Sequence, residues 1–167
     1  MGGVTIFNTT RRLRILSSAL LLISVSLNAT EKLVVERIAT INANCSDVWI
    51  FAGGFETIDN MLKKITNIQT DGNTVGSIRV LTLEDGAVIK ERLETLESSS
   101  YSYVFIEHPL PVTKYRATIS VSDDTDGKCN FNWKGEFVAK AVSDAEAMGI
   151  FEGIYESGIA EIMKKFP

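Results

Sequence analysis

The segment Ser143–Phe166 constrains the fold more than any other part of the chain. Its apolar residues recur every three or four positions, which is the spacing of one stripe along a helix: Met148, Phe151, Tyr155, Ile159, Ile162 and Phe166. Ser143 and Glu146 have the spacing of a capping box at the helix start. A long helix with one apolar side needs a large apolar partner, so we expect the preceding chain to supply a sheet.

Three glycines interrupt this expected helix, at Gly149, Gly153 and Gly158. Each costs about 1 kcal/mol relative to Ala inside a helix. We therefore expect the sheet or a ligand to approach the helix backbone closely at these positions.

The preceding residues show the pattern of a sheet. Apolar and polar side chains alternate in four segments: Ser77–Leu83, Val88–Leu96, Tyr115–Val121 and Cys129–Phe137. Further strands are predicted at Leu33–Ile41, Lys63–Gln69 and Tyr101–Ile106, and short helices at Val48–Ala52 and Glu56–Leu62. Such alternation is typical of an antiparallel sheet with one face in solvent and one face covered, here by the final helix.

The N-terminus differs in kind from the rest of the chain. Met1–Arg14 carries three arginines and no acidic residue, and Ile15–Leu27 is almost wholly apolar. With a small residue at Ala29, this order is typical of a secretory signal peptide, and the apolar run is shorter than the roughly 20 residues that span a bilayer. We expect a signal peptide at 1–29, a domain at 30–167, export to the periplasm or the exterior, and no stable membrane anchor after cleavage.

Composition excludes several function classes. The net charge is −4, and the basic residues cluster only at the N-terminus, so nucleic acid is not an expected partner. The chain has one His, which leaves little basis for a zinc site or a His-based triad. Cys45 and Cys129 have no metal-site spacing, and export would place them in an oxidising compartment. We expect neither a metal nor a cofactor.

Two charged residues lie on the apolar face of their predicted strands. A lone charge there costs several kcal/mol unless it is paired. If Glu84–Gly86 is a three-residue hairpin loop with Gly86 in the left-handed conformation, Arg79 faces Glu91. Two interpretations stay open. The pair is either a polar centre in a cavity, with Glu91 as acid/base and Arg79 as anion clamp, or a structural ion pair, which is the commoner case.

Six short segments occur in an order known from one family: Gly76–Gly86, Lys90–Leu93, Tyr101–Tyr103, Pro109–Val112, Tyr115–Thr118 and Gly153–Gly158. In this order they resemble the polyketide cyclase/dehydrase and lipid-transport family of the START-like (SRPBCC) superfamily, from about Leu33 to the end. The resemblance implies an α+β helix-grip fold. In that fold, a curved antiparallel sheet of about seven strands surrounds a long C-terminal helix, and two short helices follow the first strand.

The resemblance also implies a function, which is the binding of a small, largely apolar ligand in a cavity between sheet and helix. Two alternatives stay open, so enzymatic activity is undecided. One is a lyase, cyclase or isomerase that uses Glu91 as acid/base, because the essential Arg and Glu of the related onion lachrymatory-factor synthase align with Arg79 and Glu91. The other is a periplasmic accessory protein of a redox enzyme, as in the exported MxaD-like branch that the chain resembles.

The expected ligand site combines the charged pair with aromatic residues of the apolar face. The predicted ligand-binding residues are Arg79, Glu91, Tyr103, Tyr115, Trp133, Phe151 and Tyr155, and Glu91 is also the candidate catalytic residue. Aromatic residues in such positions are more often core than ligand contacts. Relatives commonly carry an aromatic or Trp-x-Pro element after the Gly-Gly-Phe turn, and Ile58–Met61 stands there in this chain.

The helix-grip order makes a further prediction about the cysteines. In that order the first and last strands pair antiparallel, so the end of the first strand lies near the start of the last. Cys45 follows Ile41 closely and Cys129 opens the last strand. We expect the two thiols to approach each other within reach of a disulfide. The alternative is two unpaired thiols, one of them in the core.

Overall fold

The computed structural model describes residues 1–2 and 31–167, and the expected signal peptide lies, apart from its first two residues, outside the described residues. The elements are β1 (Leu33–Ile41), α1 (Cys45–Ala52), the 3-10 helix η1 (Ile58–Asn60), β2 (Ile65–Thr70), β3 (Ile78–Leu83), β4 (Val88–Leu96), β5 (Ser100–Glu107), β6 (Val112–Asp123), β7 (Cys129–Ala139) and α2 (Asp144–Lys165). The predicted order of elements is confirmed. The second short helix is only one 3-10 turn.

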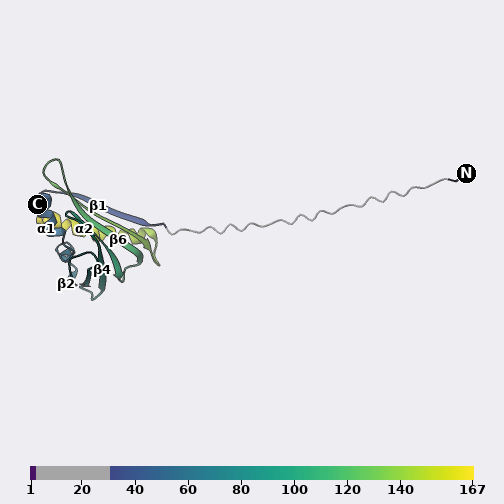
Figure 1. Cartoon of the computed structure of the whole chain (residues 1–167), viewed down its shortest axis with the longest axis horizontal. Coiled ribbons are helices and arrows are strands. Elements are labelled where there is room, and N and C mark those ends of the chain that lie inside the picture. The colour runs from purple at the N-terminus through teal and green to yellow at the C-terminus, as the bar shows by residue number, and fades with distance from the viewer. Residues whose placement is uncertain (3–30) are drawn as a thin grey trace.

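The seven strands form one antiparallel sheet in the order β1-β7-β6-β5-β4-β3-β2. Neighbouring strands follow one another in sequence except at β1, which pairs with β7 and so joins the two ends of the fold. The α2 helix, yellow in Figure 1, lies against this sheet and contacts β1 and β7. This is the helix-grip architecture that the sequence predicts.

The α2 helix buries four of the six residues of the predicted stripe, whereas Met148 and Phe166 are half-buried. Its buried residues are Ala147, Phe151, Tyr155, Gly158, Ile159 and Ile162. The Ser143 hydroxyl accepts a hydrogen bond from the Glu146 amide at 3.2 Å and caps the helix start. On the exposed side, Arg37 of β1 forms ion pairs with Glu152 and Glu156 at 3.1 and 2.9 Å. Such surface pairs contribute little stability, so burial of the stripe is what holds α2 in place.

The expectation about the helix glycines is confirmed at one position and wrong at two. A Cβ on Gly158 would lie 2.7 Å from Cζ3 of Trp133, so the helix backbone does meet the sheet there. A Cβ on Gly149 or Gly153 would meet no atom within 4 Å. The sequence reasoning missed Gly135 of β7, where a Cβ would collide with the Tyr155 hydroxyl.

Two matched substitutions test this placement of α2. Gly158→Ala is expected to destabilise the protein by about 1–3 kcal/mol, because the new methyl group overpacks the contact with Trp133. Gly153→Ala adds the same methyl group in open space and is expected to stabilise by up to about 1 kcal/mol, since Ala is the better helix former. Urea unfolding of both variants measures the difference. Equal effects of the two substitutions would contradict the packing described here.

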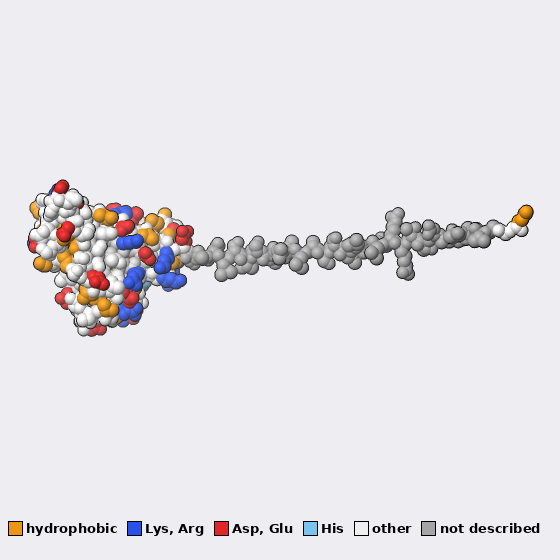
Figure 2. Space-filling view, turned by 45° about the horizontal axis from the view of Figure 1, so that its top comes forward, with side chains coloured by type: hydrophobic (Ala, Val, Ile, Leu, Met, Phe, Trp, Pro, Cys, Tyr) orange, Lys and Arg blue, Asp and Glu red, His pale blue; other side chains and the backbone are white. Residues whose placement is uncertain are grey.

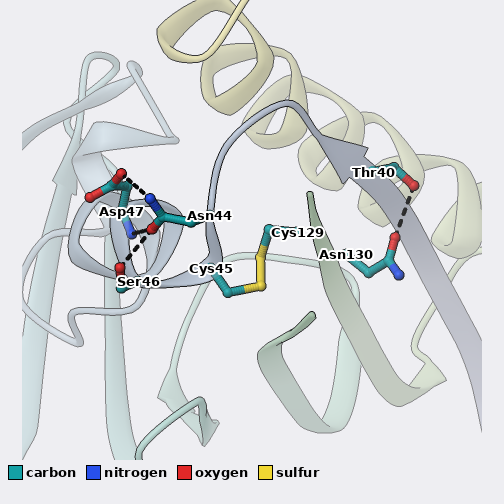
Figure 3. The surroundings of a disulfide bond; sticks show 7 residues. All are labelled: Thr40, Asn44, Cys45, Ser46, Asp47, Cys129 and Asn130. Atoms are coloured by element: carbon teal, nitrogen blue, oxygen red, sulfur yellow. Dashed lines mark hydrogen bonds between the residues drawn. A yellow bond between two sulfur atoms is a disulfide. The ribbon is translucent and has the colours of Figure 1, made fainter. Parts of the chain in front are cut away.

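The predicted approach of the two cysteines is confirmed, and they form a disulfide. Cys129 pairs with Ile41 in the β1–β7 register, and the Cα atoms of Cys45 and Cys129 are 4.8 Å apart. Figure 3 shows this bond beside the start of α1, where the Asn44 side chain accepts a hydrogen bond from the Asp47 amide at 2.9 Å. The disulfide therefore ties the first helix to the start of the last strand.

Within the described part of the chain, no helix combines the length and the apolar character needed to cross a membrane. Figure 2 shows acidic and basic side chains interspersed over one face of the domain.

Candidate functional site

The β3–β4 hairpin brings the two buried charges together. Gly86 has a φ of +83°, the left-handed conformation that the three-residue loop requires. The Leu83 amide donates to the Ala87 carbonyl at 2.9 Å, and from this turn the register places Arg79 opposite Glu91. The predicted pairing is confirmed.

The Arg79–Glu91 pair is buried, with 0% and 4% of the two side chains exposed. Arg79 Nε donates to Glu91 Oε2, and Nη1 donates to the Phe55 carbonyl. The guanidinium carbon lies 4.3 Å from the centre of the Phe55 ring and 4.9 Å from that of Tyr103. Arg79 therefore fixes the Glu91 carboxylate and also holds the segment after α1 against the sheet.

Burial changes the acidity of this pair. Burial raises the pKa of the Glu91 carboxyl above its usual range, and the neighbouring Arg79 charge opposes that rise. Burial is the largest influence on the pKa of Arg79 and acts to lower it, but the charge of Glu91, its hydrogen bond with Arg79 and the nearby Tyr101 and Tyr103 together raise the pKa, so the guanidinium keeps its proton. The result is a carboxylate that takes up a proton more readily than an exposed Glu while a fixed cation stands beside it.

A pocket of about 300 Å³ opens next to Glu91, at the lower end of the size range of small-molecule sites. It lies between the β3–β4 hairpin, the connection from η1 to β2, the loop before β6, and α2. Its lining residues are Leu62, Lys63, Lys64, Ile65, Leu81, Leu83, Asp85, Ile89, Glu91, Tyr103, Phe105, Leu110, Tyr115, Trp133, Phe151 and Ile154. Most of this lining is apolar or aromatic, and Glu91 is its one buried charge.

Five of the seven predicted ligand-binding residues line this pocket: Glu91, Tyr103, Tyr115, Trp133 and Phe151. The other two, Arg79 and Tyr155, are absent from the lining and support residues that belong to it. Arg79 holds Glu91, and the Tyr155 hydroxyl lies 2.8 Å from that of Tyr115. Burial raises the pKa of both tyrosines, so their hydroxyls stay protonated at neutral pH.

The aromatic residues of the interior divide into pocket wall and solid core. Phe105 stacks on Tyr115 with ring centres 3.8 Å apart, and Tyr115 stacks on Phe151 at 4.7 Å. Behind this wall, Phe137 packs on Phe151 at 4.5 Å and does not line the pocket. The space beneath α2 is therefore part core and part cavity.

The pocket mouth includes residues that were not among the predicted site residues. It is formed by Leu62, Lys63 and Lys64 before β2, by Asp85 in the hairpin turn, and by Leu110 in the loop before β6. These residues lie outside regular elements and show no periodicity. Among the lining residues that were not predicted, Ile154 of α2 could have been found from the sequence, because it follows Ile150 at helical spacing beside the predicted apolar stripe.

Some buried polar atoms around the pocket have no hydrogen-bond partner among the described residues. They include the indole Nε1 of Trp133, which lines the pocket, and Nη2 of Arg79 behind it. Unused buried donors are uncommon in folded proteins. The described residues contain no cluster of three or more His, Cys, Asp or Glu side chains able to hold a metal ion.

A family model described as polyketide cyclase/dehydrase and lipid transport matches residues 32–166. None of the curated proteins compared with the chain matches it.

Several solved structures are also similar to this chain. An uncharacterised protein from Bacillus thuringiensis is 32% identical, with a TM-score of 0.74 and coverage of 80% of this chain and 98% of its own. The protein XoxI from Bacillus cereus is also 32% identical, with a TM-score of 0.74 and coverage of 80% and 94%. A norcoclaurine synthase variant from Thalictrum flavum, bound to a transition-state analogue, is 21% identical at a TM-score of 0.61, with coverage of 81% and 94%. This last likeness shows the fold alone.

Proposed function

Because the chain belongs to the polyketide cyclase/dehydrase and lipid transport family, we propose that it binds one small, largely apolar molecule in the pocket beside Glu91. The observation that carries this proposal is the composition of the pocket wall. Apolar and aromatic side chains supply most of the contact area, and a single buried carboxylate supplies a polar anchor. This is the usual composition of a site that binds a small organic molecule.

Filling the pocket tests the proposal. The neutral fluorescent probe N-phenylnaphthylamine is expected to bind the parent protein saturably at one site. Ile154→Trp places a larger side chain on the pocket wall and is expected to weaken binding at least about tenfold, a loss of roughly 1.4 kcal/mol.

The matched control is Ile150→Trp, one turn earlier on α2 and outside the pocket lining, which is expected to leave affinity unchanged. Thermal melts establish that both variants are folded. The absence of saturable binding to the parent protein, or equal losses in the two variants, would contradict the proposal.

A cyclase, lyase or isomerase activity is the second candidate, and one observation favours it. Glu91 lines the pocket, and burial raises the pKa of its carboxyl, as suits a group that exchanges a proton with a bound molecule. The role of Arg79 in this reading is to stabilise the carboxylate form. A substrate-dependent proton exchange that is lost in Glu91→Gln, with the fold intact, would distinguish this activity from binding alone.

We also propose that the protein is exported. The Cys45–Cys129 disulfide supports this location, because such bonds persist mainly in oxidising compartments. The MxaD-like role as an accessory of a periplasmic redox enzyme stays a prediction.

A further inference from the structure

We propose that the ligand is a flat ring compound that carries a neutral hydrogen-bond donor of the phenol type, which it places on Glu91. This inference rests on the proposed function and specifies the chemical class of the bound molecule. It follows from the state of the carboxylate, from the charge balance of the site and from the shape of the wall.

One carboxylate oxygen of Glu91 has no side-chain donor within the described part of the chain. Glu91 Oε2 accepts from Arg79 Nε, and within residues 31–167 no side chain donates to Oε1. Oε1 is not one of the fully buried unpaired atoms, and Glu91 lines the pocket, so this oxygen can be reached from the pocket. A ligand donor in the pocket can therefore form a hydrogen bond to a carboxylate oxygen that no side chain uses.

The charges of the Arg79–Glu91 pair limit the charge that a ligand beside Glu91 can carry. Arg79 already neutralises Glu91, and both side chains are buried. A carboxylate ligand would bring a second negative charge to Glu91 in surroundings of low dielectric constant, where repulsion is strong. An ammonium ligand would leave the site with an excess positive charge that water cannot reach. A neutral hydroxyl group donates a hydrogen bond to Glu91 and leaves the net charge of the site unchanged.

The wall of the pocket is suited to a flat ring. Tyr103, Phe105, Tyr115, Trp133 and Phe151 present aromatic rings to the pocket. Tyr115 already stacks on Phe105 and Phe151, and rings in this arrangement favour a further flat ring. The indole N–H of Trp133 has no hydrogen-bond partner among the described residues but is buried in the wall, so the ring of Trp133 is what lines the pocket.

Four naphthalene compounds test the inference by competing with N-phenylnaphthylamine for the pocket. Naphthol has the ring and the donor, its methyl ether keeps the oxygen without the donor, naphthalene has neither, and naphthoate carries an anion. We expect naphthol to bind at least about tenfold tighter than the ether and naphthalene, since a hydrogen bond to a charged group is among the strongest that a neutral ligand can form. Naphthoate should bind most weakly.

A double variant tests whether the preference for naphthol over its ether depends on the Arg79–Glu91 pair. Arg79→Met/Glu91→Leu replaces the pair by apolar groups of similar size and is expected to bind naphthol and its ether equally. Equal affinities of all four compounds for the parent protein would overturn this inference and leave the proposed function standing, and so would tightest binding of naphthoate. Failure of N-phenylnaphthylamine to bind at all would remove the proposed function itself.

Discussion

Replacing Glu91 with Ala is expected to destabilise the protein by about 3–5 kcal/mol. The substitution leaves the Arg79 guanidinium buried with 0% exposure and without its counter-charge. Its remaining hydrogen bond goes to the neutral Phe55 carbonyl, which cannot balance the charge. Chemical denaturation followed by circular dichroism measures the loss.

A double variant separates the cost of an unpaired charge from the worth of the pair. Arg79→Met/Glu91→Leu removes both charges and is expected to be far more stable than Glu91→Ala, because apolar replacements of buried ion pairs are often neutral or stabilising. A loss below about 0.5 kcal/mol for Glu91→Ala would show a pair that behaves as if it were exposed to solvent. The acceptor role of Glu91 would then fail as well.

Breaking the disulfide is the second large effect. The bond joins residues 84 positions apart, and the chain-entropy relation for a loop of this length gives about 4.5 kcal/mol of stabilisation. Native disulfides of small secreted domains commonly contribute about 2–5 kcal/mol. Reduction with a thiol is therefore expected to shift the unfolding midpoint strongly downward.

The Cys45→Ala/Cys129→Ala variant is the control for this measurement. Its midpoint should not change on addition of the thiol, and it should lie at or below that of the reduced parent, because Cys129 is also a buried core residue. A parent protein whose midpoint is unaffected by reduction would contradict a stabilising role for this bond.

Most of the fold could be predicted from the sequence, because its elements have strong periodicity. The β1 and β4 strands have the predicted bounds, and α2 differs from its prediction by one residue at each end. The short helix predicted at Glu56–Leu62 is one 3-10 turn, since only three residues there adopt helical geometry. Short segments give too few periods to distinguish a helix from a turn.

The glycine error has a geometric cause. Gly158 follows Tyr155 by three positions and so falls on the buried stripe, whereas Gly153 follows Phe151 by two and falls on the opposite side. The spacing of these glycines from the buried residues is visible in the sequence, but the low helix propensity of glycine does not by itself show which side of the helix a glycine is on. Helical position decides whether a glycine marks a close contact.

The candidate site was predictable where strand register determines it. The hairpin turn sets Arg79 against Glu91, and alternation directs Tyr115 and Trp133 to the covered face of the sheet. The contributions of Lys63 and Asp85 to the pocket mouth were not predictable, because the segments that carry them meet only in the folded chain. The sequence therefore predicted the floor of the pocket but only part of its entrance.

The two indole groups of this protein report directly on the central claim, which is that the pocket beside Glu91 binds a small apolar molecule. Trp133 lines the pocket and Trp49, on α1, does not. In a proton–nitrogen correlation spectrum titrated with naphthol, we expect the indole signal of Trp133 to shift and saturate while that of Trp49 stays in place. A Trp49→Phe variant assigns the two signals. An unchanged Trp133 signal at saturating naphthol, or a shift confined to Trp49, would contradict the account.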